Sequence, residues 1–173
     1  MNLEDLKKPL PKEAIKKHPT KSYLSSIKAI YVTERFNEVF GVGKWTVKVN
    51  QQHVDHETGM VVVKVLFEVP ELSIYYESFG GNDNGGKNSK NFDLGDAYKG
   101  ATTDALTKIG SYLGVGIDVF KGLEYKPELT IDSIQFKSAI SKGSKLQALK
   151  KYFYISTEVA QEYNKQLEQN GDN

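Results

Sequence analysis

The stretch HVDHETG brings four potential metal ligands together: His53, Asp55, His56 and Glu57. On an extended strand His53 and Asp55 share a face, which is the minimum that a metal-dependent nuclease would need. Hairpin tips are polar in any case, and no second cluster of His, Asp or Glu follows nearby in the sequence. We therefore predict a hairpin turn here, without a metal ion.

Motifs of catalysis are not found elsewhere in the sequence. It contains no Ser-His-Asp order, no nucleophile elbow and no Walker A loop. GVGKW lacks the Ser or Thr of a phosphate loop, and GGNDNGG is not the glycine-rich turn of a βαβ unit. We expect a protein that is not an enzyme and that uses no cofactor.

Basic and aromatic side chains offer a different chemistry. Proteins that bind single strands follow the phosphate backbone with cations and stack bases on aromatic rings. The candidates for such contacts come from two predicted helices, one strand and a long Gly/Asn loop. They are Lys28, Tyr31, Arg35, Lys48, Lys87, Lys90, Lys99 and Lys108.

Two of these lysines cannot serve one narrow groove together. Lys99 and Lys108 are nine positions apart, which places them about 180° apart around a straight helix. Asp104 precedes Lys108 by four residues, so a surface ion pair would explain Lys108 equally well.

The charge composition favours contact with the nucleic-acid backbone over base readout. Of 23 basic residues only Arg35 is an arginine, and the net charge is +1. Lysine acts as a point charge on phosphate, whereas arginine forms the fork that reads base edges. An AT-rich coding bias would produce the same preference for lysine. With no cysteine and no long apolar run, we expect a cytoplasmic protein without a membrane contact.

The predicted elements that position these residues form an α+β fold. Helical spacing of apolar residues lies within 23–40, and Gly41 ends that helix. Alternating runs over 45–54, 60–69 and 72–79 predict an antiparallel meander, in which Trp45, Val47 and Val49 share a face. A loop at 80–91 leads to a helix over about 94–112, on which the meander packs.

The flanks of this region differ in composition. Residues 1–22 form a basic N-terminal arm that we predict to be loosely packed, and 23–125 form the main domain. Residues 126–173 are predicted to be a helical tail, with amphipathic pieces at 133–140 and 145–153. A last helix is capped by Ser156 and buries Val159, Tyr163 and Leu167.

Several glycines lie within the predicted helix over 94–112 or just after it. Gly95 and Gly100 predict close approach near its start, and Gly114 predicts its end. Gly110 has neither explanation, and we expect a tight packing contact there.

Two blocks of the sequence resemble the Rad52 family of single-strand annealing proteins. The first block is FNEVFGVGKW followed by VNQQHVD, and the second is LGDAYKGATTDALTKIGSYLG. Together they cover about residues 23–122. The residues on the family pattern are Asn37, Glu38, Phe40, Gly41, Trp45, Gln51, Gln52, Val54, Asp55, Lys99, Ala101, Thr103, Asp104, Leu106, Lys108 and Gly114.

The resemblance implies a β-β-β-α core that assembles into a homo-oligomeric ring. Single-stranded DNA would lie in a basic groove around the ring and pair with a complementary strand, without ATP or another cofactor. A single-strand-binding protein is a further candidate partner. The chain ends soon after the annealing domain, which predicts a phage or bacterial version that acts in recombination and repair.

The chain departs from the family pattern on the second helix. Thr107 and Ser111 stand where the family carries basic residues beside Lys108, so the groove would be less positive. Three other readings stay open: a ring that protects DNA ends without annealing, a metal-dependent nuclease using His53, Asp55 and His56, and a structural oligomer.

Overall fold

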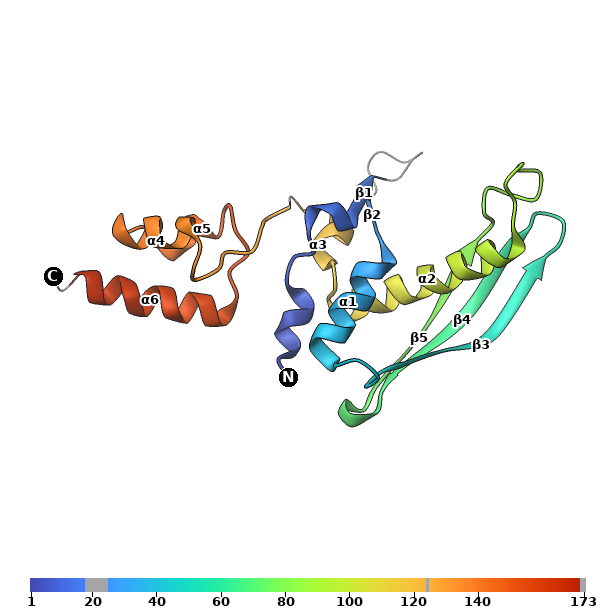
Figure 1. Cartoon of the computed structure of the whole chain (residues 1–173), viewed down its shortest axis with the longest axis horizontal. Helices are drawn as coiled ribbons and strands as arrows, with labels where there is room; N and C mark the ends of the chain where they lie inside the picture. The colour runs from blue at the N-terminus through green and yellow to red at the C-terminus, as the bar shows by residue number, and fades with distance from the viewer. Residues whose placement is uncertain (18–24, 124, 172–173) are drawn as a thin grey trace.

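The computed structural model describes residues 1–17, 25–123 and 125–171 (Figure 1). Its main sheet has the strand order β3-β4-β5, with β3 over Thr46–Asp55, β4 over Met60–Val69 and β5 over Ile74–Asn82. All neighbouring strands are antiparallel, and a 3-10 turn, η3 (Pro70–Leu72), joins β4 to β5. The α+β class and the antiparallel strands are confirmed.

The central strand β4 follows the alternation expected from its sequence. Val61, Val63, Val65 and Phe67 are fully buried, while the residues between them are half-buried on the opposite face. The inner face is covered by α2 (Leu94–Leu113) and, at one end, by α1 (Ala29–Phe40), which places the core between sheet and helices (Figure 1).

The edge strand β3 breaks its alternation with a bulge between Val49 and Gln51. Trp45 and Val47 pack against the core before the bulge, and Val54 packs against it afterwards. Val49 pairs with the buried Val65 and lies on the same face as Val47, as expected, but on this edge strand it is 45% exposed. The extra residue at the bulge reverses the in–out order beyond it, so that Val54 faces the core where His53 and Asp55 would otherwise lie.

An aromatic cluster joins α1 to the sheet. The Phe36 and Phe67 ring centroids are 4.8 Å apart, and Trp45 lies edge-on to Phe36 at 5.5 Å. The Trp45 indole N–H donates to the Asn37 Oδ1 at 3.0 Å. Asn37 and Trp45 of the first motif therefore fix the chain as it leaves α1 and enters β3.

Close contacts of glycines hold α2 against its neighbours. A Cβ on Gly80 would overlap the Ala101 carbonyl and Ala105, and one on Gly100 would overlap the Asn82 amide. A Cβ on Gly110 would lie 2.7 Å from Val32 Cγ1 of α1, which confirms the packing contact expected there. Gly114 ends α2 at φ +101°, also as expected.

Gly110→Ala is expected to destabilise the chain by about 1–2 kcal/mol, because the added methyl group overpacks the α1–α2 contact. Val32→Ala, combined with it, is expected to recover part of this loss by making room. Urea unfolding of both single variants and the double variant tests the coupling. Strictly additive losses would show that Val32 does not limit the space at Gly110.

The N-terminal arm differs from our expectation. Residues 3–7 and 12–14 form 3-10 turns, and β1 (Ile15–Lys17) pairs with β2 (Ser25–Ile27). Leu6, Leu10 and Ala14 are buried in the main core. The prediction of a loosely packed arm is wrong for residues 1–17, since their apolar side chains complete the core. Residues 18–22 of the arm, and 23–24 of the predicted main domain, lie outside the described residues.

The C-terminal helices form a second cluster with its own core. After α3 (Ile117–Phe120) come α4 (Ile134–Ser141), α5 (Leu146–Leu149) and α6 (Thr157–Gly171), at the far end from the β3–β4 hairpin (Figure 1). Ser156 Oγ accepts from the Val159 N–H at 3.3 Å, as predicted. The shared core consists of Leu129, Phe136, Ala139, Ile140, Val159 and Tyr163.

Polar contacts join this cluster to the main body. The Thr157 hydroxyl donates to Glu4 at 2.9 Å, and Lys8 lies 3.6 Å from Glu128. No helix in the described part of the chain is long and apolar enough to cross a bilayer.

Candidate nucleic-acid interface

A shallow groove runs along the solvent side of α2. Its other wall is formed by β2 and the start of α1. We call this surface the α2 groove. It is lined by Ser25, Ser26, Ile27, Ala29, Asn82, Gly100, Thr103, Asp104, Thr107 and Phe120. Its walls supply hydroxyl, amide and carboxylate groups, and Phe120 supplies an aromatic ring that is 43% exposed.

The α2 residues of the groove share one side of the helix because α2 buries the other. Ala97, Ala101, Ala105 and Ile109 face the sheet and are fully buried. Gly100, Thr103 and Thr107 therefore lie on the opposite side, where the two threonine hydroxyls donate to carbonyls of the preceding turn. Thr107, where the resemblance led us to expect a basic residue, lines the groove.

Lys28 and Tyr31 belong to the α1 side of the molecule near this groove, but neither side chain lines it. Lys28 is the residue before α1, and its neighbours Ile27 and Ala29 both line the groove. Its ammonium group lies 5.8 Å from the centroid of the Tyr31 ring, a cation–π arrangement. Tyr31 is half-buried against the main core, so a base could stack only on the part of the ring left exposed.

Lys87 and Lys90 belong to the loop that leads into α2, and Lys99 to the second turn of α2. This loop and the start of α2 lie at the same end of the molecule as the β3–β4 hairpin (Figure 1). Lys87 joins the Gly/Asn loop to the β3–β4 hairpin: its backbone N–H donates to the Thr58 carbonyl at 2.9 Å and its ammonium to the His56 carbonyl at 2.7 Å. Lys90 is exposed and forms no ion pair with another described residue.

Lys99 lies beside a carboxylate group. Its side chain is 78% exposed and lies 2.9 Å from Asp96, whose hydrogen bond raises the pKa of Lys99. The local charge that Lys99 presents to a phosphate is thus partly offset, whereas that of Lys90 is not.

Arg35 stabilises the fold by binding backbone carbonyls of the N-terminal segment. The side chain is almost fully buried, and its guanidinium group donates to the carbonyls of Asp5 at 2.7 Å, Lys8 at 2.8 Å and Pro9 at 3.3 Å. Its Nε pairs with Glu38 at 3.2 Å. Since these donors are taken up within the chain, we correct our prediction and remove Arg35 from the DNA contacts.

Lys48 and Lys108 lie apart from the α2 groove. Lys48 is on β3, 3.6 Å from Glu68 on the sheet face away from α2. Lys108 lies 5.4 Å from the Tyr112 ring, which packs on Tyr76 of β5. Asp104 accepts from the Gly81 N–H at 3.1 Å, so it anchors β5 to α2 and does not form the ion pair with Lys108 that the sequence allowed.

The HVDHETG stretch forms the β3–β4 turn. Asp55 accepts hydrogen bonds from the Glu57 N–H at 2.8 Å and the Thr58 hydroxyl at 2.7 Å. The Thr58 hydroxyl, followed by the Glu57 N–H, lowers the pKa of Asp55. Among the described residues no three His, Asp or Glu side chains come close enough to hold a metal ion. Both Asp55 oxygens stabilise the turn.

The structure therefore divides the predicted contacts. Lys28 and Tyr31 lie near the α2 groove without lining it, Lys87, Lys90 and Lys99 lie at the start of α2, and Lys48 and Lys108 lie on other surfaces. We did not expect Asn82 or Ser26 among the groove residues. These residues reach the groove because β2 and β5 lie beside α2 in the fold. Such a contact between distant segments leaves no local pattern in the sequence.

Comparison with known proteins yields one family. Residues 2–109 match the family model described as "Rad52/22 family double-strand break repair protein". This match covers more than half of the chain and includes α1, the whole sheet and most of α2. No curated protein matches the chain.

Proposed function

Since the chain belongs to the Rad52/22 family of double-strand break repair proteins, we propose that it binds single-stranded DNA and anneals complementary strands. Family membership assigns it to DNA recombination and repair. In our proposal annealing needs neither ATP nor another cofactor, and the chain catalyses no covalent step. Its contribution is to hold one strand with the bases free to pair.

The observation that carries this proposal is the α2 groove. It lies along the exposed side of the helix that resembles the family's signature, with Lys28 on one side and Lys99 one turn from Thr103. The hydroxyl and amide groups of its walls suit weak contact to a sugar–phosphate backbone without base readout, while the Asp104 carboxylate accepts a hydrogen bond from the Gly81 N–H. Such contacts release counterions, so binding should depend on salt.

Assembly of several subunits would repeat these few cations along one track. The sheet face away from α2 supports a contact between subunits, because it carries Tyr75 and Phe79, which are 59% and 62% exposed. Between them Glu77 accepts from Lys64 at 2.7 Å and from Asn50 at 3.2 Å, which ties the three strands together. In a ring, weak contacts on each subunit add up to firm binding.

The combined substitution Lys90→Ala and Lys99→Ala is expected to weaken binding of a labelled oligonucleotide and to slow annealing. Each lost phosphate contact lowers the salt slope by about 0.7 for a single strand, so the slope should fall by about 1.4. Fluorescence anisotropy over a range of salt concentrations measures the binding, and fluorescence transfer between complementary strands measures annealing.

The matched control is Lys12→Ala with Lys165→Ala, which removes the same charge from exposed positions away from α2. It should leave the salt slope close to that of the wild type. An equal fall in slope for both variants would assign the effect to net charge and remove Lys90 and Lys99 from the interface. Binding without any annealing by the wild type would favour end protection instead.

A further inference from the structure

The C-terminal cluster has an uneven distribution of charge. Residues 133–155, which contain α4 and α5, include no acidic residue and five lysines. We call these lysines the α4–α5 lysine set: Lys137, Lys142, Lys145, Lys150 and Lys151. The third helix of the cluster, α6, carries Glu158, Glu162 and Glu168.

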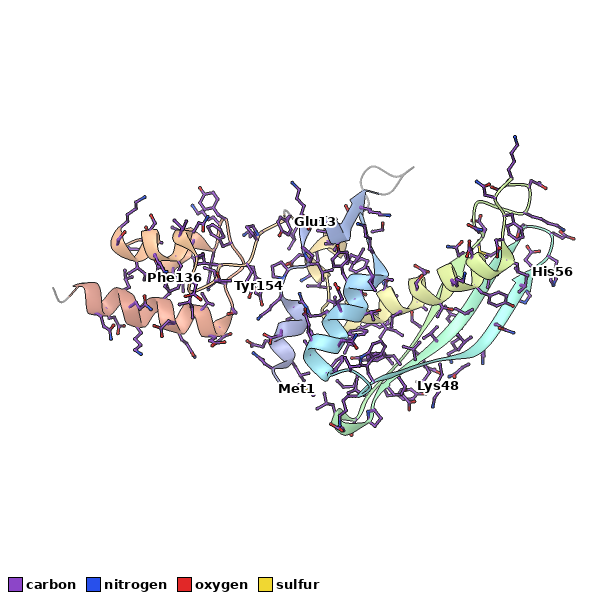
Figure 2. The ribbon with its side chains drawn as sticks, viewed as in Figure 1. Met1, Glu13, Lys48, His56, Phe136 and Tyr154 are labelled. Carbon is purple, nitrogen blue, oxygen red and sulfur yellow. The ribbon has the colours of Figure 1, made fainter. Side chains whose placement is uncertain are left out.

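Packing places the lysine set on the outside of the cluster. Phe136 and Tyr163 form the contact between α4 and α6, with ring centroids 5.3 Å apart, and Phe136 points into that interface (Figure 2). The side of α4 and α5 that faces α6 is thus apolar. All five lysines are exposed: Lys137 lies on α4, and the other four lie just before or just after α4 and α5.

These lysines also lack acidic partners. In the described parts of the chain every ion pair lies among residues 5–128, as for Lys44 with Glu71 and Lys64 with Glu77. Five described lysines of the main body thus pair with carboxylates, whereas the lysine set remains available to an external anion.

Apolar and aromatic groups accompany the charge. A shallow groove between α4 and α5 is lined by Ile134, Gln135, Ser138, Ala139, Lys142, Ser144, Leu149 and Phe153. Tyr152 follows Lys151 and is 69% exposed. Lysines beside an exposed aromatic ring suit single-stranded nucleic acid, because the lysines can contact phosphates while a base stacks on the ring. An acidic protein segment would pair with the lysines but would not need the Tyr152 ring.

We propose that the α4–α5 lysine set, together with Tyr152, is a second binding surface for single-stranded nucleic acid. It lies outside the residues that match the family and does not depend on the α2 groove. Two surfaces on one subunit would let the chain hold a strand in the α2 groove while the second surface collects another strand.

The test uses the full chain with Lys142→Gln, Lys145→Gln and Lys151→Gln combined. We expect affinity for labelled oligo-dT at low salt to fall at least about tenfold, and the salt slope to fall by about 2, since three contacts are lost. The charge-matched control replaces Lys12, Lys16 and Lys165 with glutamine, all exposed and outside the lysine set. Circular dichroism checks that both variants keep the fold.

The same variant set, made in the Lys90→Ala, Lys99→Ala background, separates the two surfaces. A further loss in that background supports the second surface even if the α2 groove proves not to bind. Photo-crosslinking to oligo-dT is expected to label Tyr152. Binding and salt slope equal to those of the charge-matched control would overturn the proposal. So would unchanged DNA binding with lost binding of a polyglutamate peptide, which would assign the lysines to an acidic protein.

Discussion

Phe67→Ala is expected to lower the free energy of unfolding by about 4 kcal/mol, the largest single loss we predict. Phe67 is fully buried at the centre of the aromatic cluster, 4.8 Å from Phe36, 5.7 Å from Trp45 and 6.1 Å from Phe40 between ring centroids. Removing the ring leaves a cavity between α1 and the sheet. Urea unfolding followed by tryptophan fluorescence measures the loss.

Phe79→Ala is the matched comparison, because Phe79 lies on the opposite face of the same sheet and is 62% exposed. Its effect on a single subunit should be within about 0.5 kcal/mol. If Phe79 joins subunits, its effect should grow with protein concentration, whereas that of Phe67 should not. A small loss for Phe67→Ala would mean that the cluster collapses to fill the cavity.

Arg35→Ala is expected to cost about 3 kcal/mol, the second large effect. The substitution removes three hydrogen bonds to residues 5–9 and leaves Glu38 without its partner. Arg35→Lys should restore little, because one ammonium group cannot reach three carbonyls in different directions. Lys48→Ala, a surface cation with a side chain 64% exposed, should be nearly neutral.

A second readout locates the damage in Arg35→Ala. Amide hydrogen exchange should rise in residues 3–14 before it rises in β4, because the guanidinium group holds that segment against α1. DNA binding by the folded fraction should stay close to that of the wild type. A selective loss of DNA affinity with unchanged stability would return Arg35 to the interface.

The sheet and its helices were predictable because their signals are local. The buried residues of β4, Val61, Val63, Val65 and Phe67, recur at every second position, and each strand pairs with the next one in the sequence. One local pattern therefore predicts both burial and pairing. The bulge beside Val49 was not predictable. A strand with one extra residue contains the same types of residue as a regular strand, so the sequence does not mark the place of the bulge.

Long-range contacts account for the errors. Leu6 and Leu10 are separated by Pro9, which breaks any helical or strand period, so nothing in the sequence marked them as core residues. Arg35 resembles a phosphate contact when only its helix is considered, and the carbonyls that it binds are 26 to 30 residues away. The α2 groove depends in the same way on β2 meeting α2.

The burial of the N-terminal segment sets an order of events during synthesis. Leu10 and Ile27 lie beside Gly116, the residue before α3, so the core is incomplete until that residue has left the ribosome. At cellular rates of translation, about 100 residues take on the order of ten seconds. For that time the first segment to emerge can pack on α1 alone, through the contacts of Arg35, and part of its apolar surface stays exposed to water.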